Sequence, residues 1–137
     1  MGVTYMVEPG PSPNPEIDGL AADYGWAHLH ALHRLLAAEE QIDLYTMERY
    51  GGERPWSAVT TDLRPLFDSA YFVDGRLPST ECGLMRRRLR EISDHWSRGE
   101  FAGEADDTMK LDQWRTIENL IAVVDACVAT GRPMIIG

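Results

Sequence analysis

The sequence has few cysteines and no long apolar run, and each shortage excludes a class of protein. The two cysteines among 137 residues, Cys82 and Cys127, stand far apart, so no disulfide framework is indicated. No uninterrupted apolar stretch approaches the ~20 residues that a membrane helix needs. The first residues lack a basic segment before an apolar one. We therefore expect a cytoplasmic protein with no secretory signal and no membrane partner.

Basic residues are also scarce, which bears on the partners of the protein. Thirteen Lys and Arg residues stand against 22 Asp and Glu residues, so the formal net charge is −9. A surface of that sign repels phosphate backbones and attracts basic proteins. The one basic run, residues 86–90, relieves the surrounding negative charge. We therefore expect a basic protein partner and no nucleic-acid partner.

Both ends of the chain are predicted to be short and extended. Residues 1–15 begin with VTYMV and continue as EPGPSPNP, which predicts a strand followed by a stiff proline-rich loop. Near the other end, Gly131 stops a helix and residues 133–136 are again apolar and extended. Because strands this short are unstable alone, we expect the two terminal segments to pair in a small two-stranded sheet.

Helical periodicity dominates the middle of the chain. Apolar stripes predict three main helices, over residues 20–50, 79–97 and 108–130. Residues 56–72 fit either a short helix or a strand. We therefore predict one domain over residues 1–137 that is mainly α, at the border with α+β, and built as a bundle of three to four helices.

Three of the four histidines lie within six positions, which raises the question of a metal site. On a helix, His30 and His33 are about 60° apart, and Asp23 and Glu40 lie near the same face. Imidazoles and carboxylates suit zinc, nickel or iron. However, no HxxxH or ExxH pair is present, so we interpret His33 as a hydrogen-bonded residue at the edge of the apolar stripe and expect no metal.

Asp43 interrupts the apolar stripe of the first predicted helix. A buried carboxylate needs a partner, and Arg88 lies at the core edge of the helix over residues 79–97. We therefore predict an Asp43–Arg88 ion pair that fixes how the two helices meet.

The segment GEFAGEADD contains four acids, one aromatic and no base. Two of its acids suit the start of the next helix, whereas the other two have no such explanation. An acidic loop with one aromatic ring is suited to a partner rich in arginine or lysine, although a solvated loop is the alternative. The predicted partner-binding residues are Glu100, Phe101, Glu104, Asp106 and Asp107, with Glu39 and Glu40 as a second patch.

The sequence contains no Gly-rich phosphate loop, GxSxG, HExxH, paired CxxC or dinucleotide fingerprint. We therefore weigh three functions. We favour a small acidic protein that neutralises a basic partner, as inhibitors of the immunity or antitoxin type do, without catalysis or a cofactor. The first alternative is a metal-dependent or small-molecule-binding helical enzyme that uses His30 and His33, with His95 and Glu91. The second is a structural module that forms homo-oligomers through an exposed tryptophan.

Overall fold

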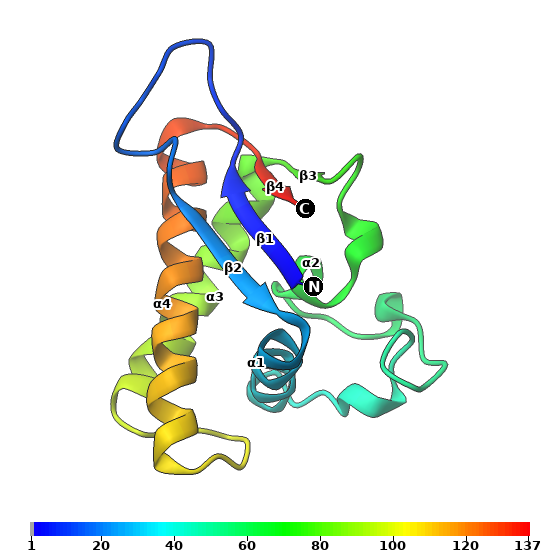
Figure 1. The fold of residues 1–137 in the computed structure, drawn as a ribbon. Helices are drawn as coiled ribbons and strands as arrows, with labels where there is room; N and C mark the ends of the chain where they lie inside the picture. The colour runs from blue at the N-terminus through cyan, green and yellow to red at the C-terminus, as the bar shows by residue number, and fades with distance from the viewer. Residues whose placement is uncertain (1) are drawn as a thin grey trace.

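The computed structural model describes residues 2–137 and combines four α-helices with one four-stranded antiparallel sheet over that range (Figure 1). About 51% of the chain is helical, so the fold is mixed α+β; it lies at the border that the sequence predicts, and 'mainly α' describes it only in part. The sheet order is β2-β1-β4-β3. Its strands are β1 (Gly2–Val7), β2 (Ala21–Gly25), β3 (Arg76–Leu77) and β4 (Met134–Ile136).

The two ends of the chain pair at the centre of the sheet, as the sequence predicts. Strand β1 runs antiparallel to β4, with Tyr5 opposite Ile136. Thr4 and Gly137 exchange two backbone hydrogen bonds of 2.9 Å. The predicted sheet was too small, because β2 adds to the free edge of β1 and β3 adds to the free edge of β4. Met1, the first residue of the predicted terminal segment, lies outside the described residues.

The single helix predicted over residues 20–50 is wrong at both ends. Its first residues form β2, because pairing with β1 outweighs the helical propensity of so short a segment. Helix α1 is therefore limited to Trp26–Glu39. Gln41 ends it in the left-handed conformation, with φ 58°. The backbone N–H of Ile42 then donates to the carbonyl of Ala37 at 2.9 Å, which completes a C-terminal cap of the Schellman type without glycine.

The other two long helices are confirmed. Helix α3 spans Ser79–Ser97 and α4 spans Asp107–Thr130. Asp106 caps α4 by accepting the backbone N–H of Met109 at 2.8 Å, and Gly131 ends the helix in the left-handed conformation. The two helices pack side by side (Figure 1), and α4 also contacts β1, β2 and β4 of the sheet. They bury most of the apolar stripes that predicted them, although Leu111, at the start of the α4 stripe, is 48% exposed.

Short helical turns, and no strand, occupy residues 56–72. They are η2 (Trp56–Ala58), α2 (Arg64–Phe67) and η3 (Ser69–Tyr71), and a further turn, η1 (Leu44–Thr46), follows α1. Pro65 stands in the first turn of α2, where its missing N–H costs nothing. The fully buried ring of Trp56 stacks on Phe67, with ring centroids 4.9 Å apart. This stacking fixes a connection that local sequence pattern leaves undetermined.

Two glycines provide a matched test of this packing. A Cβ at Gly52 would stand 2.1 Å from the backbone of Thr46, whereas a Cβ at Gly83, inside α3, would meet no atom within 4 Å. We expect Gly52→Ala to lower the free energy of unfolding by about 1–3 kcal/mol. Gly83→Ala should raise it by about 0.5–1 kcal/mol through its higher helix propensity. Urea denaturation measures both, and equal effects of the two substitutions would contradict this packing.

Candidate functional site

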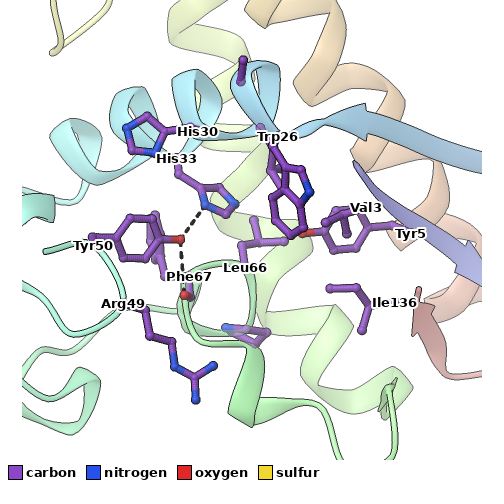
Figure 2. A pocket seen from close by; sticks show the side chains of 13 residues that line it. Val3, Tyr5, Trp26, His30, His33, Arg49, Tyr50, Leu66, Phe67 and Ile136 are labelled. Carbon is purple, nitrogen blue, oxygen red and sulfur yellow. Dashed lines mark hydrogen bonds between the residues drawn. The ribbon is translucent and has the colours of Figure 1, made fainter. Parts of the chain in front are cut away.

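A cavity of about 700 Å³ lies between the start of α1, the centre of the sheet and the turns before and within α2 (Figure 2). Its walls are mostly apolar and aromatic, with two histidines and one arginine. The residues that line it are Val3, Tyr5, Trp26, Ala27, Leu29, His30, His33, Arg49, Tyr50, Pro65, Leu66, Phe67 and Ile136.

Simple periodicities bring these side chains to the cavity. Along β1, Val3 and Tyr5 point to the same face because strand side chains alternate. Along α1, Trp26, His30 and His33 recur at helical spacing and share one face. The two histidines therefore lie together, as their spacing predicts. The remaining walls come from segments that lie far apart in sequence and meet only in the fold.

His33 is a buried histidine in the cavity wall. Its residue is only 6% exposed, and its ring stands between Tyr50 and Trp26 in Figure 2. Nδ1 lies 2.6 Å from the Tyr50 hydroxyl, which in turn lies 3.3 Å from the backbone carbonyl of Phe67. The other ring nitrogen, Nε2, is buried without a hydrogen-bond partner. Buried polar atoms are rarely left unpaired, so this atom is a candidate for contact with a ligand.

The hydrogen-bond chain indicates the proton positions. The Tyr50 hydroxyl has one proton, which it donates to the carbonyl of Phe67. The proton of the other hydrogen bond must therefore come from Nδ1–H of His33. In this tautomer, Nε2 carries a lone pair and acts as an acceptor. Burial, together with the nearby His30, lowers the pKa of His33 to about 4, and burial raises the pKa of Tyr50 to about 12. Both groups are therefore uncharged at neutral pH.

Arg49 lies at the edge of the cavity in an unusual backbone conformation. Its φ is 72°, in the left-handed region that glycine favours. The turn around it is fixed by backbone hydrogen bonds of 3.1 Å from Tyr50 and Gly52 to the carbonyl of Met47. Gln41 and Asp74 have positive φ as well, so the conformation alone does not mark Arg49 as functional.

The candidate metal column of Asp23, His30, His33 and Glu40, which the sequence analysis already disfavours, does not form. Asp23 lies on β2 and accepts a hydrogen bond from the Thr4 hydroxyl, while the Nε2 atom of His30 lies 3.1 Å from the Tyr45 hydroxyl. Among residues 2–137, no group of three or more His, Cys, Asp or Glu side chains is arranged to hold a metal. These four residues would share one face only if the helix began before residue 23. Residues 21–25 form the strand β2 instead.

The predicted Asp43–Arg88 pair is also corrected. Asp43 is exposed in the turn after α1. Arg88 instead pairs with the Glu40 carboxylate and donates to the carbonyl of Glu39 at 3.2 Å. Because α1 ends before residue 43, the carboxylate that faces Arg88 is that of Glu40. An ion pair does join the two helices, but through a different acid.

The acidic loop is tied to the protein. The Glu39 carboxylate accepts the backbone N–H of Ala102 at 2.7 Å, and Arg34 donates to the carbonyl of Glu104 at 3.0 Å. Phe101 is half-buried and stacks on Trp96, with ring centroids 4.5 Å apart. Phe101, which was predicted to contact a partner, therefore packs against the core of the protein.

The acids of this loop have separate roles. Asp106 is the cap of α4, and Glu100 pairs with Arg98 at 3.2 Å. This exposed pair lowers the pKa of Glu100 by hydrogen bonding and by charge. Glu104 and Asp107 are exposed. Glu39 and Glu40, the predicted second patch, are both used in internal contacts.

Glu91 and His95, the other two residues of the first alternative, lie away from the cavity. Both are exposed on α3, and neither belongs to the lining that includes His30 and His33. The Glu91 carboxylate lies 3.7 Å from the Arg88 guanidinium. The sequence analysis therefore grouped His95 with His30 and His33, whereas the fold places His95 outside the cavity.

A third histidine takes part in an arrangement that resembles a catalytic triad. His28 places Nε2 2.6 Å from the Thr116 hydroxyl and Nδ1 3.8 Å from the Asp112 carboxylate. Thr116 is buried inside α4, where helical backbone N–H groups are already bonded and cannot stabilise an oxyanion. The Tyr24 hydroxyl also donates to the carbonyl of Thr116 at 3.0 Å. We interpret these contacts as a structural connection of β2 and α1 to α4.

Comparisons of the chain with protein-family models, with curated proteins and with solved structures gave no match. The candidate function therefore depends on the geometry of the site alone. No helix within residues 2–137 combines the length and the apolar character that crossing a membrane requires.

Several cavity residues were missed by the sequence analysis. Trp26 is 57% exposed at the rim, whereas Tyr5 and Phe67 are buried in the walls. The helical spacing from Trp26 to His33 is a signal that was available in the sequence. Arg49 and Tyr50, just before Gly51-Gly52, carry a signal for a turn but none for a cavity.

The buried His33 predicts acid sensitivity. The folded protein disfavours protonated His33, so the unfolded chain binds more protons between about pH 6.5 and about pH 4. Stability is therefore complete above this window and falls as the pH is lowered through it. His33 alone should remove about 2 kcal/mol of unfolding free energy at about pH 5. Urea denaturation at about pH 7.5 and about pH 5 measures this loss.

The control for this experiment is His95, which is exposed on α3. His33→Gln should reduce the difference between the two pH values, whereas His95→Gln should leave most of it. An unchanged difference in the His33 variant would show that another group causes the acid sensitivity.

Proposed function

We propose that this protein binds a small, largely apolar molecule in the cavity beneath α1. The observation that carries the proposal is the position of His33, a buried histidine with an unpartnered Nε2 in the wall of a cavity of about 700 Å³. Ligand sites in proteins usually have volumes of about 300–1,000 Å³, apolar walls and a few fixed polar groups. The cavity has each of these properties.

The shape of the site supports binding of a flat molecule. Rings of Tyr5, Trp26, Tyr50 and Phe67 line the cavity, and aromatic rings pack well against planar ligands. Phe67 and Tyr50 are held in place by the buried Trp56, whose ring is stacked on the first and meets the second edge-on. The walls are thus preorganised, which reduces the entropy lost on binding.

The proposal concerns binding rather than catalysis. His33 is fixed in one orientation by Tyr50 and is uncharged, so it is suited to accept a hydrogen bond. A general base works best with a pKa near the operating pH, and the pKa of about 4 lies well below it. The geometry therefore favours the small-molecule-binding part of the first alternative over its enzymatic part.

A fluorescent neutral probe, N-phenyl-1-naphthylamine, tests this proposal. We expect saturable 1:1 binding with increased probe fluorescence, because the apolar walls exclude water from the dye. Ala27→Trp should weaken binding at least tenfold, since Ala27 is exposed on the first turn of α1 and lines the cavity.

Ala122→Trp is the matched control, because Ala122 is also an exposed helical alanine but lies on α4 outside the cavity. It should bind the probe like the wild type. Absence of binding to the folded wild-type protein, or equal binding by the two variants, would overturn the proposal.

A second candidate function is recognition of a basic protein by the acidic loop, as in inhibitors of the immunity or antitoxin type. The observation that favours it is the attachment of the loop to α1 through Arg34 and Glu39, which preorganises its exposed acids. Because Phe101 packs on Trp96, recognition would depend on charge and would be sensitive to salt.

Three charge-removing substitutions in the loop test this second candidate: Glu100→Gln, Glu104→Gln and Asp107→Asn. A basic protein retained from a lysate of the source cells should be lost from the triple variant. The control removes the same charge from other exposed acids, by Glu16→Gln, Glu53→Gln and Asp74→Asn. Equal retention by both triple variants would exclude the loop as the binding surface.

A further inference from the structure

We propose that the ligand of this cavity is an uncharged phenol whose hydroxyl donates to Nε2 of His33 and accepts from the hydroxyl of Tyr5. This inference rests on the proposed small-molecule binding and adds the chemical class of the ligand. Two polar atoms of the cavity wall carry it, because each lacks a hydrogen-bond partner in the described part of the chain and the two face the same space.

Tyr5 presents its hydroxyl to the cavity from the sheet (Figure 2). The residue belongs to β1 and is only 1% exposed, so the surrounding core holds its ring in place. No hydrogen bond between described residues involves this hydroxyl. Burial, and to a smaller extent the nearby Tyr50, raises the pKa of Tyr5, so the hydroxyl keeps its proton at neutral pH. It is therefore available to donate to a ligand.

His33 presents the complementary atom from α1. Its Nδ1–H donates to Tyr50, so Nε2 carries a lone pair and requires a donor. Figure 2 shows this nitrogen and the Tyr5 hydroxyl directed from opposite walls toward the space beside Trp26. A single ligand atom that both donates and accepts would satisfy both groups. A hydroxyl oxygen is the smallest group with that property.

Trp26 gives a route from solvent to His33. Nε2 is buried, so a ligand must move a neighbouring side chain to reach it. Trp26 lies beside His33 in Figure 2, at the rim of the cavity, and is 57% exposed. Exposed side chains change rotamer within nanoseconds. The Trp26 ring can therefore turn outward as a ligand enters, while the buried walls keep their packing.

The remaining features of the ligand follow from the character of the walls. Both Tyr5 and His33 are uncharged at neutral pH, so neither compensates a charge that is buried between them. A hydroxyl on an aromatic ring is neutral at this pH, like that of tyrosine. The ring itself packs against the aromatic walls that Tyr50 and Phe67 provide. A phenol therefore matches both the polar and the aromatic parts of the cavity.

Isothermal titration calorimetry with two matched probes tests this class. 2-Naphthol and 2-methylnaphthalene have the same rings and nearly the same size, and a methyl group replaces the hydroxyl in the second. The methyl compound is the more apolar, so a cavity that forms no hydrogen bond with the ligand would bind it more tightly. We expect the wild-type protein to bind 2-naphthol at least about threefold more tightly than 2-methylnaphthalene.

Two variants each remove one of the two polar atoms, and a third is the control. Tyr5→Phe deletes the hydroxyl and should reduce the preference for 2-naphthol at least about threefold. His33→Asn removes Nε2, keeps an N–H at the δ position for Tyr50, and should reduce the preference similarly. Tyr71→Phe deletes a tyrosine hydroxyl outside the lining and should preserve it. Because the preference compares two probes in one variant, a general loss of folding weakens both together.

The outcomes distinguish this inference from the function on which it rests. If N-phenyl-1-naphthylamine binds but the two naphthalenes bind equally or not at all, the ligand class is wrong and the cavity still binds small molecules. If the dye and both naphthalenes fail to bind, both proposals are overturned. If Tyr71→Phe reduces the preference as much as Tyr5→Phe does, hydrogen bonds inside the cavity do not cause it and the inference is overturned.

Discussion

The pairing of β1 with β4 is the interaction on which the rest of the structure depends. It joins the two ends of the chain at the centre of the sheet, so that β2 and β3 each need only one partner at an outer edge. The same pairing brings Tyr5 opposite Ile136, and both residues line the cavity. Closing a loop that contains nearly the whole chain costs entropy, and the packing of α4 against β1, β2 and β4 offsets that cost.

The cavity follows from how this sheet meets α1. Strand β2 leads directly into the helix at Trp26, so the first turns of α1 lie over the end of β1 that carries Val3 and Tyr5. The chain then returns beneath α1 through turns that lack long regular elements. Tyr50 and Phe67, which these turns carry, form part of the cavity wall. The stacked Trp56 and Phe67 keep that space from collapsing.

Acidic charge has different consequences in different parts of the molecule. Many acids stabilise the fold: Glu40 joins α1 to α3 through Arg88, Glu39 holds the loop before α4, and Asp106 caps α4. Their roles in internal contacts explain why a list of acids in the sequence is a weak guide to a binding surface. The described lining of the cavity contains no acid, so the acids of the sequence do not mark this site.

The sequence by itself determined α3, α4 and the pairing of the termini, because stripes such as Met85, Leu89 and Ile92 fix a helix locally and two short apolar ends need each other. It also placed His30 and His33 on one face. Only the tertiary structure decided that residues 21–25 form a strand, that Arg88 meets Glu40, and that Arg49 shares a cavity with Tyr5. These outcomes depend on contacts between distant segments, which local periodicity does not encode.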